Sequence, residues 1–158
     1  MLQAETYQEQ AVLCFVREGS RVLLIEKRRG LGAGKVNAPG GKVEPGETYL
    51  QAAIRETREE VCVEAGDLHL RGALGFRFAD GYSLYVQVFV AQSHTGTPAE
   101  TPEAHPFWCE TSEIPYGRMW ADDIVWLPQV LDGYEVEGDF TFDGDRMTGG
   151  TVQLRWQP

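Results

Sequence analysis

Hydrophobic positions along the chain follow two periodic patterns, one typical of strands and one typical of helices. Apolar segments predict strands at 11–16, 21–26, 68–78, 82–91 and 107–109, and a final hairpin of 135–142 with 151–156. A helical period predicts helices at 47–60, introduced by Pro45 and Gly46, and at 122–131, followed by Gly133. Helices interleaved with strands and hairpins predict an α/β fold in which helices flank a central mixed sheet.

The helix predicted at 47–60 presents two faces once its residues are placed about 100° apart. The face that we expect to be buried is formed by Leu50, Ala53, Ile54, Thr57 and Val61. A different face gathers Glu56, Glu59 and Glu60 at the i, i+3 and i+4 spacing of side chains that meet. Like charges this close, near the negative end of the helix dipole, destabilise a helix unless a cation binds them. Carboxylates so arranged suit Mg²⁺ or Mn²⁺, and the alternative is a solvated acidic face.

The length and charge of the chain narrow the classes of partner. Its 158 residues, 42% of them apolar, suit one folded domain spanning 1–158. The formal net charge of −10 argues against nucleic acid polymers and anionic membranes, and a small anionic ligand would need local basic groups or metal ions. The N-terminal residues lack the apolar segment of a signal peptide, and no apolar run reaches the roughly 18 residues of a membrane span. We therefore expect a cytoplasmic protein, and we expect it to act as a monomer.

Three cysteines, Cys14, Cys62 and Cys109, are far apart in the sequence and include no C-x-x-C pair. Their odd number and spacing predict neither a disulfide framework nor a zinc site. We expect three small apolar core residues in a reducing compartment.

A basic, glycine-rich loop follows the second predicted strand and has the sequence GLGAGK at 30–35. It fails as a P-loop, because Arg29 stands where the first glycine belongs and Val36 stands where Ser or Thr belongs. It fails as a dinucleotide-binding turn, because Lys35 replaces the third glycine. We interpret the loop as a mobile basic element near the phosphates, with Lys27 as the main contact, or else as a solvated basic loop.

The segment from Gly41 to Val63 resembles the Nudix box, G-x5-E-x7-R-E-U-x-E-E-x-G-U, in which U is a bulky apolar residue. Its glycine and charged positions match at Gly41, at Glu47 and in the run RETREE at 55–60. The two departures are Thr57 at a bulky apolar position and Cys62 at the last glycine. Cys62 puts the turn after the helix in question, because glycine takes a positive φ at little cost. The resemblance to the Nudix family implies the Nudix fold, an α/β/α sandwich around a mixed sheet.

The same resemblance implies roles at the phosphate end of a site. It implies a magnesium centre, with manganese as an alternative, in which Glu56 or Glu60 also serves as the general base. A glutamate matching Glu103 lies near the metals in this family, although a solvated loop acid is the alternative here. The implied catalytic residues are Glu56, Glu59, Glu60 and Glu103, and the implied metal ligands are these four and the Gly40 carbonyl.

Two further roles in the box are structural under this resemblance. Glu47 and Arg55 pair and brace the helix. Gly40 and Gly41 let the backbone approach ligand or metal closely, and the alternative is that they form a plain turn.

Strings outside the box resemble the oxidised purine nucleoside triphosphatase branch of the family (MutT-like, 8-oxo-dGTPase) over most of 12–156. These strings are RGLGAGKVN at 29–37, GGKVEPGET at 40–48, GTP at 96–98, EIP at 113–115 and MWADD at 119–123. The branch hydrolyses 8-oxo-dGTP and 2-hydroxy-dATP and so removes oxidised nucleotides from the cellular pool.

A base pocket is expected from residues outside the box. Phe76, Phe78 and Trp120 offer flat surfaces for a purine, although plain core packing is the alternative for the two phenylalanines. Asn37 offers both a hydrogen-bond donor and an acceptor. Leu84 stands where a methionine often packs on the base in this branch.

Adjacent Asp122 and Asp123 are the second part of that expected pocket. If they are enclosed together they need not both ionise, so a neutral carboxyl can donate while a charged one accepts. The alternative is that they only begin a helix, where anions are favoured.

These patterns predict Mg²⁺-dependent hydrolysis of a purine nucleoside triphosphate, with oxidised purines first, to a monophosphate and pyrophosphate. Ordinary nucleoside triphosphates, dinucleoside polyphosphates and capped RNA are alternatives within the same chemistry. A non-catalytic nucleotide-binding Nudix module is the alternative from another class. Such modules commonly lose glutamates of the box, and here all of them are present.

Overall fold

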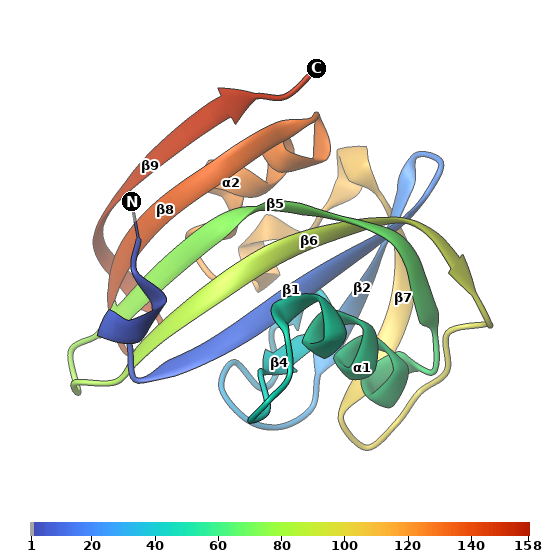
Figure 1. The fold of residues 1–158 in the computed structure, drawn as a ribbon, viewed down its shortest axis with the longest axis horizontal. Coiled ribbons are helices and arrows are strands. Elements are labelled where there is room, and N and C mark those ends of the chain that lie inside the picture. Colours follow the sequence, from blue (N-terminus) through green and yellow to red (C-terminus); the bar gives the residue numbers. More distant parts are fainter. Residues whose placement is uncertain (1) are drawn as a thin grey trace.

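The computed structural model of the protein describes residues 2–158 as a mixed sheet with two α-helices (Figure 1). The strands are β1 (Glu9–Glu18), β2 (Arg21–Lys27), β3 (Val36–Asn37), β4 (Gly40–Lys42), β5 (Glu64–Phe78), β6 (Ser83–Thr95), β7 (Ala104–Glu110), β8 (Tyr134–Asp143) and β9 (Arg146–Trp156). The helices are α1 (Tyr49–Val61) and α2 (Asp123–Leu131), with short 3-10 turns η1 (Ala4–Thr6), η2 (Thr111–Glu113) and η3 (Tyr116–Arg118). The predicted long strands and both predicted helices are present, whereas sequence analysis missed β3, β4 and the 3-10 turns.

The sheet joins parallel and antiparallel pairs. Its main path runs β3-β2-β1-β6-β5-β8-β9, while β4 pairs with β1 and β7 pairs with β2. The pairs β1–β6 and β5–β8 are parallel, and the other pairs are antiparallel. Figure 1 shows α1 in front of the sheet and α2 behind it, so the predicted α/β/α sandwich of the Nudix fold is confirmed.

Strand β1 supplies both hydrophobic cores, because successive side chains of a strand point to opposite faces. Ala11 and Phe15 belong to the core under α2, where the Phe15 ring meets Trp126 edge-on at 6.0 Å. Val12 and Cys14 belong to the core under α1. The centre of the sheet is therefore buried on both sides, and loops at its ends are free to form a site.

Helix α1 begins with a capping box two residues after the predicted start. The Thr48 hydroxyl accepts a hydrogen bond from Gln51 N, and the Gln51 side chain accepts one from Thr48 N. The helix ends at Cys62, whose φ of 64° and ψ of 28° are left-handed. The turn expected from the glycine of the box is thus kept by a residue with a side chain, at a conformational cost.

The face predicted to be buried on α1 is partly wrong. Leu50 is 45% exposed, and Ile54 is half-buried. The buried residues are Ala52, Ala53, Thr57, Glu60 and Val61. Helix α1 packs against β1, β4 and β5 through small side chains, which turns Leu50 in the first turn towards solvent and brings one of the predicted acidic residues inside.

The three cysteines are free, but only one is a core residue as predicted. Cys14 is buried, Cys62 is exposed because it occupies the turn after α1, and Cys109 is half-buried beside the carbonyls of Glu110 and Glu113. Within residues 2–158 no helix is both long and apolar enough to cross a membrane.

Candidate active site

One cavity of about 1010 Å³ gathers nearly all the predicted site residues. It opens between β1, α1, the loop after β2, and the start of α2. The predicted residues that line it are Lys27, Asn37, Gly40, Glu56, Glu60, Phe76, Phe78, Leu84, Glu103, Trp120, Asp122 and Asp123. Glu59 lies outside this lining and has a side chain 57% exposed.

Arg55 organises the phosphate end of the cavity. Its Nε and Nη2 donate to the two oxygens of Glu47 at 2.6 and 2.9 Å, so the predicted brace is present. Its Nη1 donates to Glu56 at 2.5 Å and to Glu59 at 3.1 Å, and its Nη2 also donates to the Lys42 carbonyl at 3.0 Å. The hydrogen bonds that Glu47 accepts from Arg55 lower the pKa of Glu47 to about 2, so the Glu47–Arg55 pair stays charged at physiological pH.

Glu60 is the most buried acidic group of α1, with 3% of its surface exposed. Burial raises the pKa of Glu60 to about 7, although the Gly40 N–H, which donates to Glu60 Oε1 at 2.7 Å, opposes this shift. Burial also raises the pKa of Glu56, against the opposing effect of Arg55. Charges on Glu56 and Glu103 further raise the pKa of Glu60, so this end holds more negative charge than its surroundings balance.

The two glycines before α1 serve close approaches within the protein. A Cβ on Gly41 would lie 2.2 Å from Glu56 Oε2, and a Cβ on Gly40 would lie 2.1 Å from the Val12 carbonyl oxygen. Gly41 therefore leaves room for the carboxylate, and Gly40 lets β4 pair closely with β1. Both glycines therefore allow close packing within the protein, and their predicted approach to a metal stays a prediction.

Carboxylate oxygens such as those of Glu56, Glu60 and Glu103 are the ligands that a hard cation prefers. In this structure they accept hydrogen bonds from protein groups instead. Among residues 2–158, no group of three or more His, Cys, Asp or Glu side chains is positioned to hold a metal ion. Arg55 binds Glu56, the Gly40 N–H binds Glu60, and Arg29 binds Glu103 at 3.0 Å. A divalent cation would offset the repulsion and burial that raise the pKa values of Glu56 and Glu60.

Basic groups face the same carboxylates from the loop after β2. Lys27 lines the cavity, and its charge lowers the pKa of Glu60. Arg29 also lines the cavity beside Glu103, and sequence analysis assigned it no role. Its position in a basic loop was visible in the sequence, but its pairing with Glu103, 74 residues away, was not.

Asp122 and Asp123 are buried at the other end, the base end, of the cavity, with 1% and 4% of their surface exposed. Trp126 Nε1 donates to Asp122 Oδ2 at 2.8 Å, and the Asp122 side chain makes no helix-capping hydrogen bond. Asp122 Oδ1 and Asp123 Oδ2 have no hydrogen-bond partner within residues 2–158.

Burial raises the pKa of Asp122 to about 6. Burial and the neighbouring Asp122 charge raise the pKa of Asp123 well above its ordinary value. The pair therefore keeps at least one proton near neutral pH, and offers a donor and an acceptor side by side.

Aromatic rings form the rest of the base end. Trp120 meets Phe78 edge-on at 6.0 Å and Phe142 edge-on at 5.3 Å, and Phe76 stacks on Phe140 at 6.0 Å. Phe76, Phe78 and Trp120 line the cavity and also pack against the core under α2. Core packing of the two phenylalanines is therefore present, and their contact with a purine stays a prediction.

Asn37 lies at the end of β3, beside these rings in the cavity lining. The Ala38 N–H donates to Asn37 Oδ1 at 2.8 Å, which fixes the orientation of the amide. Its Nδ2 has no protein acceptor within residues 2–158, and this half-buried donor can bond to water or to a ligand.

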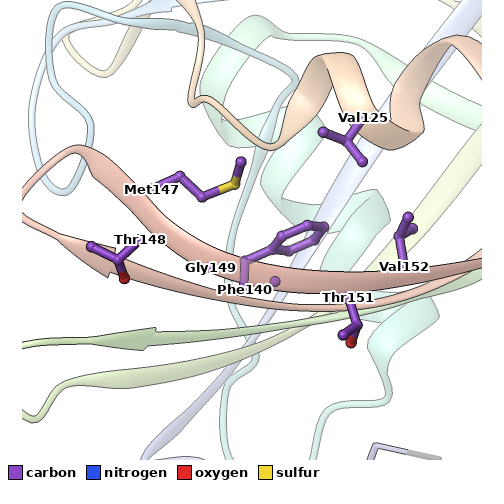
Figure 2. A pocket seen from close by; sticks show the side chains of 8 residues that line it. Val125, Phe140, Met147, Thr148, Gly149, Thr151 and Val152 are labelled. Atoms are coloured by element: carbon purple, nitrogen blue, oxygen red, sulfur yellow. The ribbon is translucent and has the colours of Figure 1, made fainter.

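A second hollow of about 310 Å³ lies between α2 and the β8–β9 hairpin (Figure 2). Figure 2 shows Val125 above Phe140, Met147 and Val152, with Thr148 and Thr151 as the polar side chains. No charged residue lines it in the described part of the chain, and none of the predicted site residues reaches it. It therefore offers no groups for phosphate chemistry.

Comparisons with known proteins agree with this geometry. A model of the NUDIX domain matches residues 7–130. The chain is 44% identical over 133 residues to "Oxidized purine nucleoside triphosphate hydrolase" of Danio rerio, covering 84% of this chain and 85% of that protein. It is 40% identical over 131 residues to the mouse protein of the same name, covering 82% and 84%. A crystal structure of a MutT protein from Bacillus halodurans superposes with a TM-score of 0.80 at 28% identity, over 92% of this chain and 97% of that one.

Proposed function

The chain belongs to the Nudix hydrolase family, and from this premise we propose that it hydrolyses oxidised purine nucleoside triphosphates, such as 8-oxo-dGTP or 2-hydroxy-dATP, to the monophosphate and pyrophosphate. One observation carries the proposal: a single cavity joins metal-type carboxylates at one end to a buried, proton-sharing aspartate pair at the other. Relatives named for this activity match most of the chain. The proposed role is to remove damaged nucleotides from the pool used for synthesis.

The proposed cofactor is Mg²⁺, which Mn²⁺ can replace, since members of this family typically depend on a divalent metal. Glu56, Glu60 and Glu103 would hold it inside the cavity, and Glu59 would join them from the exposed side of the same helix turn. The Gly40 carbonyl is the remaining proposed ligand. When bound, such an ion neutralises phosphate charge and lowers the pKa of a bound water.

The chain's own groups complete the phosphate end. Lys27 and Arg29 balance phosphate charge from the loop side of the cavity. Glu60 or Glu56 accepts the proton of the attacking water in this proposal, and both line the cavity beside the proposed metal ligands. Arg55 holds Glu56 in place while Glu47 holds Arg55.

The base end discriminates purines through hydrogen bonds. Guanine has an acceptor at N7, whereas 8-oxoguanine has a donor there and an acceptor at C8. A pair of carboxyl groups with one proton, Asp122 and Asp123, can match a donor beside an acceptor. A site with buried polar atoms rejects a ligand that leaves those atoms unpaired. Asn37 supplies a further donor, while Trp120 and Leu84 enclose the ring faces.

In this proposal a single domain of 158 residues acts as a monomer. The three free thiols suit a reducing compartment such as the cytoplasm. The partner is a small nucleotide, since the net charge of −10 repels nucleic acid polymers and anionic membranes.

The decisive experiment compares kcat/KM for 8-oxo-dGTP, 2-hydroxy-dATP, dGTP, dATP, a dinucleoside polyphosphate and capped RNA with Mg²⁺ present. We expect the oxidised purines to rank first and pyrophosphate to be released. Equal values for oxidised and ordinary purines would remove the sanitising role, and a first rank for another substrate would replace it within the same chemistry. Nucleotide binding without any phosphate release would instead support a non-catalytic module.

The metal assignment is tested separately. Glu59→Gln and Glu60→Gln keep side-chain size and remove one charge each. We expect activity to fall in both variants and Mg²⁺ affinity, measured by calorimetry, to weaken. Full activity in both variants would contradict the metal assignment.

A further inference from the structure

Lys35 contacts the base pocket from outside, in a place that the proposed function does not use. Its Nζ lies 5.2 Å from the centre of the Trp120 ring, within the distance at which a cation is attracted to an aromatic face. Trp120 lines the cavity, whereas Lys35 is not among the described residues that line it. Lys35 therefore contacts the indole without lining the cavity itself.

The Lys35 side chain is held in this position. It is only 26% exposed, and its Nζ lies 3.4 Å from Asp145 Oδ2 in the turn between β8 and β9. The Lys27 N–H donates to the Lys35 carbonyl at 2.9 Å, and the Lys35 N–H donates to the Gly32 carbonyl at 2.9 Å. A lysine usually keeps its ammonium free in water, so this fixed placement implies a specific contact.

Gly32 shows how closely the same loop fits the indole. A Cβ on Gly32 would lie 2.8 Å from Trp120 Nε1, and its φ of 82° belongs to the region that glycine favours. The loop edge and Lys35 thus enclose Trp120 on two sides. The orientation of the indole depends on both.

We propose that Lys35 is a positioning residue that sets base specificity: it fixes the Trp120 indole and draws electron density away from the face that stacks on the purine. The inference rests on the proposed function, because it assumes that the base stacks on Trp120. An extra oxygen on the ring makes an oxidised purine more electron-rich than its parent. An indole polarised by a cation stacks better on an electron-rich ring, because the two negative ring faces repel each other less.

The principal test replaces Lys35 by Met, which keeps length and removes the charge, and by Arg, which keeps the charge. For Lys35→Met we expect KM for 8-oxo-dGTP to rise by about 3- to 10-fold, with a smaller rise for dGTP and kcat within about 2-fold of the wild-type value. Lys35→Arg restores both KM values. Asp145→Asn, which removes the anchor, gives a rise of about 2-fold for 8-oxo-dGTP. Arg146→Met, at the start of β9, removes a positive charge that pairs with Asp143 and serves as the matched control.

A double mutant separates this role from simple support of the loop. If Lys35 acts through the indole, Lys35→Met has no further effect on KM in a Trp120→Leu background. An unchanged KM in Lys35→Met, an equal loss in Lys35→Met and Lys35→Arg, an equal loss for both nucleotides, or additivity with Trp120→Leu would each overturn the proposal.

Binding of the products 8-oxo-dGMP and dGMP, followed by calorimetry without metal, distinguishes failure of the two proposals. If the wild type hydrolyses neither triphosphate, the proposed function fails. The Lys35 effect is then judged from these affinities alone: a larger loss for 8-oxo-dGMP in Lys35→Met supports it, and equal or absent losses overturn it.

Discussion

The two ends of the large cavity treat buried carboxyl groups in opposite ways. At the phosphate end, Glu56 and Glu60 accept hydrogen bonds from Arg55 and the Gly40 N–H. At the base end, Asp122 Oδ1 and Asp123 Oδ2 have no partner within residues 2–158. A partnered carboxylate is already oriented and can exchange its partner for a cation, whereas an unpartnered buried oxygen costs free energy until a ligand binds it. Under the proposed function, the protein would organise the reaction end by itself, and the substrate would complete the recognition end.

The largest expected effect is a loss of kcat from a substitution at the phosphate end. Glu60→Gln removes a charge inside the cavity and should lower kcat by about 100-fold or more, as loss of one transition-state electrostatic contact does. Steady-state kinetics with Mg²⁺ gives the measurement. Glu64→Gln, an exposed glutamate just beyond α1 that pairs with Arg58, is the matched control and should keep its activity. Wild-type kcat in Glu60→Gln would show that this end is not the reaction centre.

The next largest effect is a loss of base discrimination from a substitution at the base end, which leaves the phosphate end unchanged. Asp123→Asn fixes a donor where the proton was shared, and should lower kcat/KM for 8-oxo-dGTP by about 100-fold. The loss should be smaller for an ordinary purine triphosphate, so the ratio of the two kcat/KM values is the quantity to measure. A uniform loss across nucleotides would mean that Asp123 supports the fold but does not read the base.

A pH-dependent stability difference sharpens the comparison at the base end. Burial raises the pKa of Asp122 from 3.8 to about 6, so the folded chain holds this proton more tightly than the unfolded chain does. Stability is therefore lost as pH rises from about 4 through 6, by about 3 kcal/mol for this group. Asp122→Asn should lack that loss, so its free energy of unfolding relative to wild type should improve between pH 4.5 and pH 8 in urea titrations.

The exposed Asp132 at the end of α2 offers the control for this pH experiment. Asp132→Asn should keep the wild-type dependence on pH. If Asp122→Asn keeps it as well, Asp122 ionises as readily in the folded chain as in the unfolded one, and the contrast between the two ends disappears.

A smaller effect tests the preorganisation of the phosphate end. Arg55→Met leaves Glu47 and Glu56 half-enclosed without their partner, and should lower the free energy of unfolding by about 2 kcal/mol. Chemical denaturation measures it. Arg58→Met removes another arginine of α1, whose exposed partner Glu64 begins β5, and should cost less than about 0.5 kcal/mol. Equal losses of stability in both variants would show that Arg55 contributes no more to folding than an exposed arginine of the same helix does.

The smallest expected effect concerns the turn that ends the phosphate-end helix. Cys62→Gly removes the cost of a left-handed residue with a side chain and should raise stability by about 0.5 to 1 kcal/mol. Asp67→Gly, at the other non-glycine residue with positive φ in the described chain, should gain less because aspartate tolerates this conformation better. A loss of stability in Cys62→Gly would mean that the side chain contributes more than its strain costs.

The contrast between the ends also separates what could be predicted from what could not. The three glutamates of α1 were identified correctly as neighbours, because helical spacing is a local property. The Glu47–Arg55 pair is present as well, but it was expected from the resemblance to the Nudix box and not from spacing. The depth of each glutamate was not, since Glu60 is buried and Glu59 is exposed. Which side of a helix faces the sheet depends on the small side chains that let it approach, and the apolar pattern pointed to Leu50 instead.

By itself the sequence determined the order of the long strands and both helices, the mixed α/β class, the acidic helix and the family, because periodicity and box spacing are properties of neighbouring residues. Only the tertiary structure decided that Asn37, Trp120 and Asp122 share one cavity with Glu60, and that Asp122 and Asp123 lose their contact with water. It also decided that Lys35 and Asp145 meet across 110 positions of sequence beside Trp120. The physical reason is that burial and proximity between distant residues arise from sheet pairing and core packing, which no local pattern encodes.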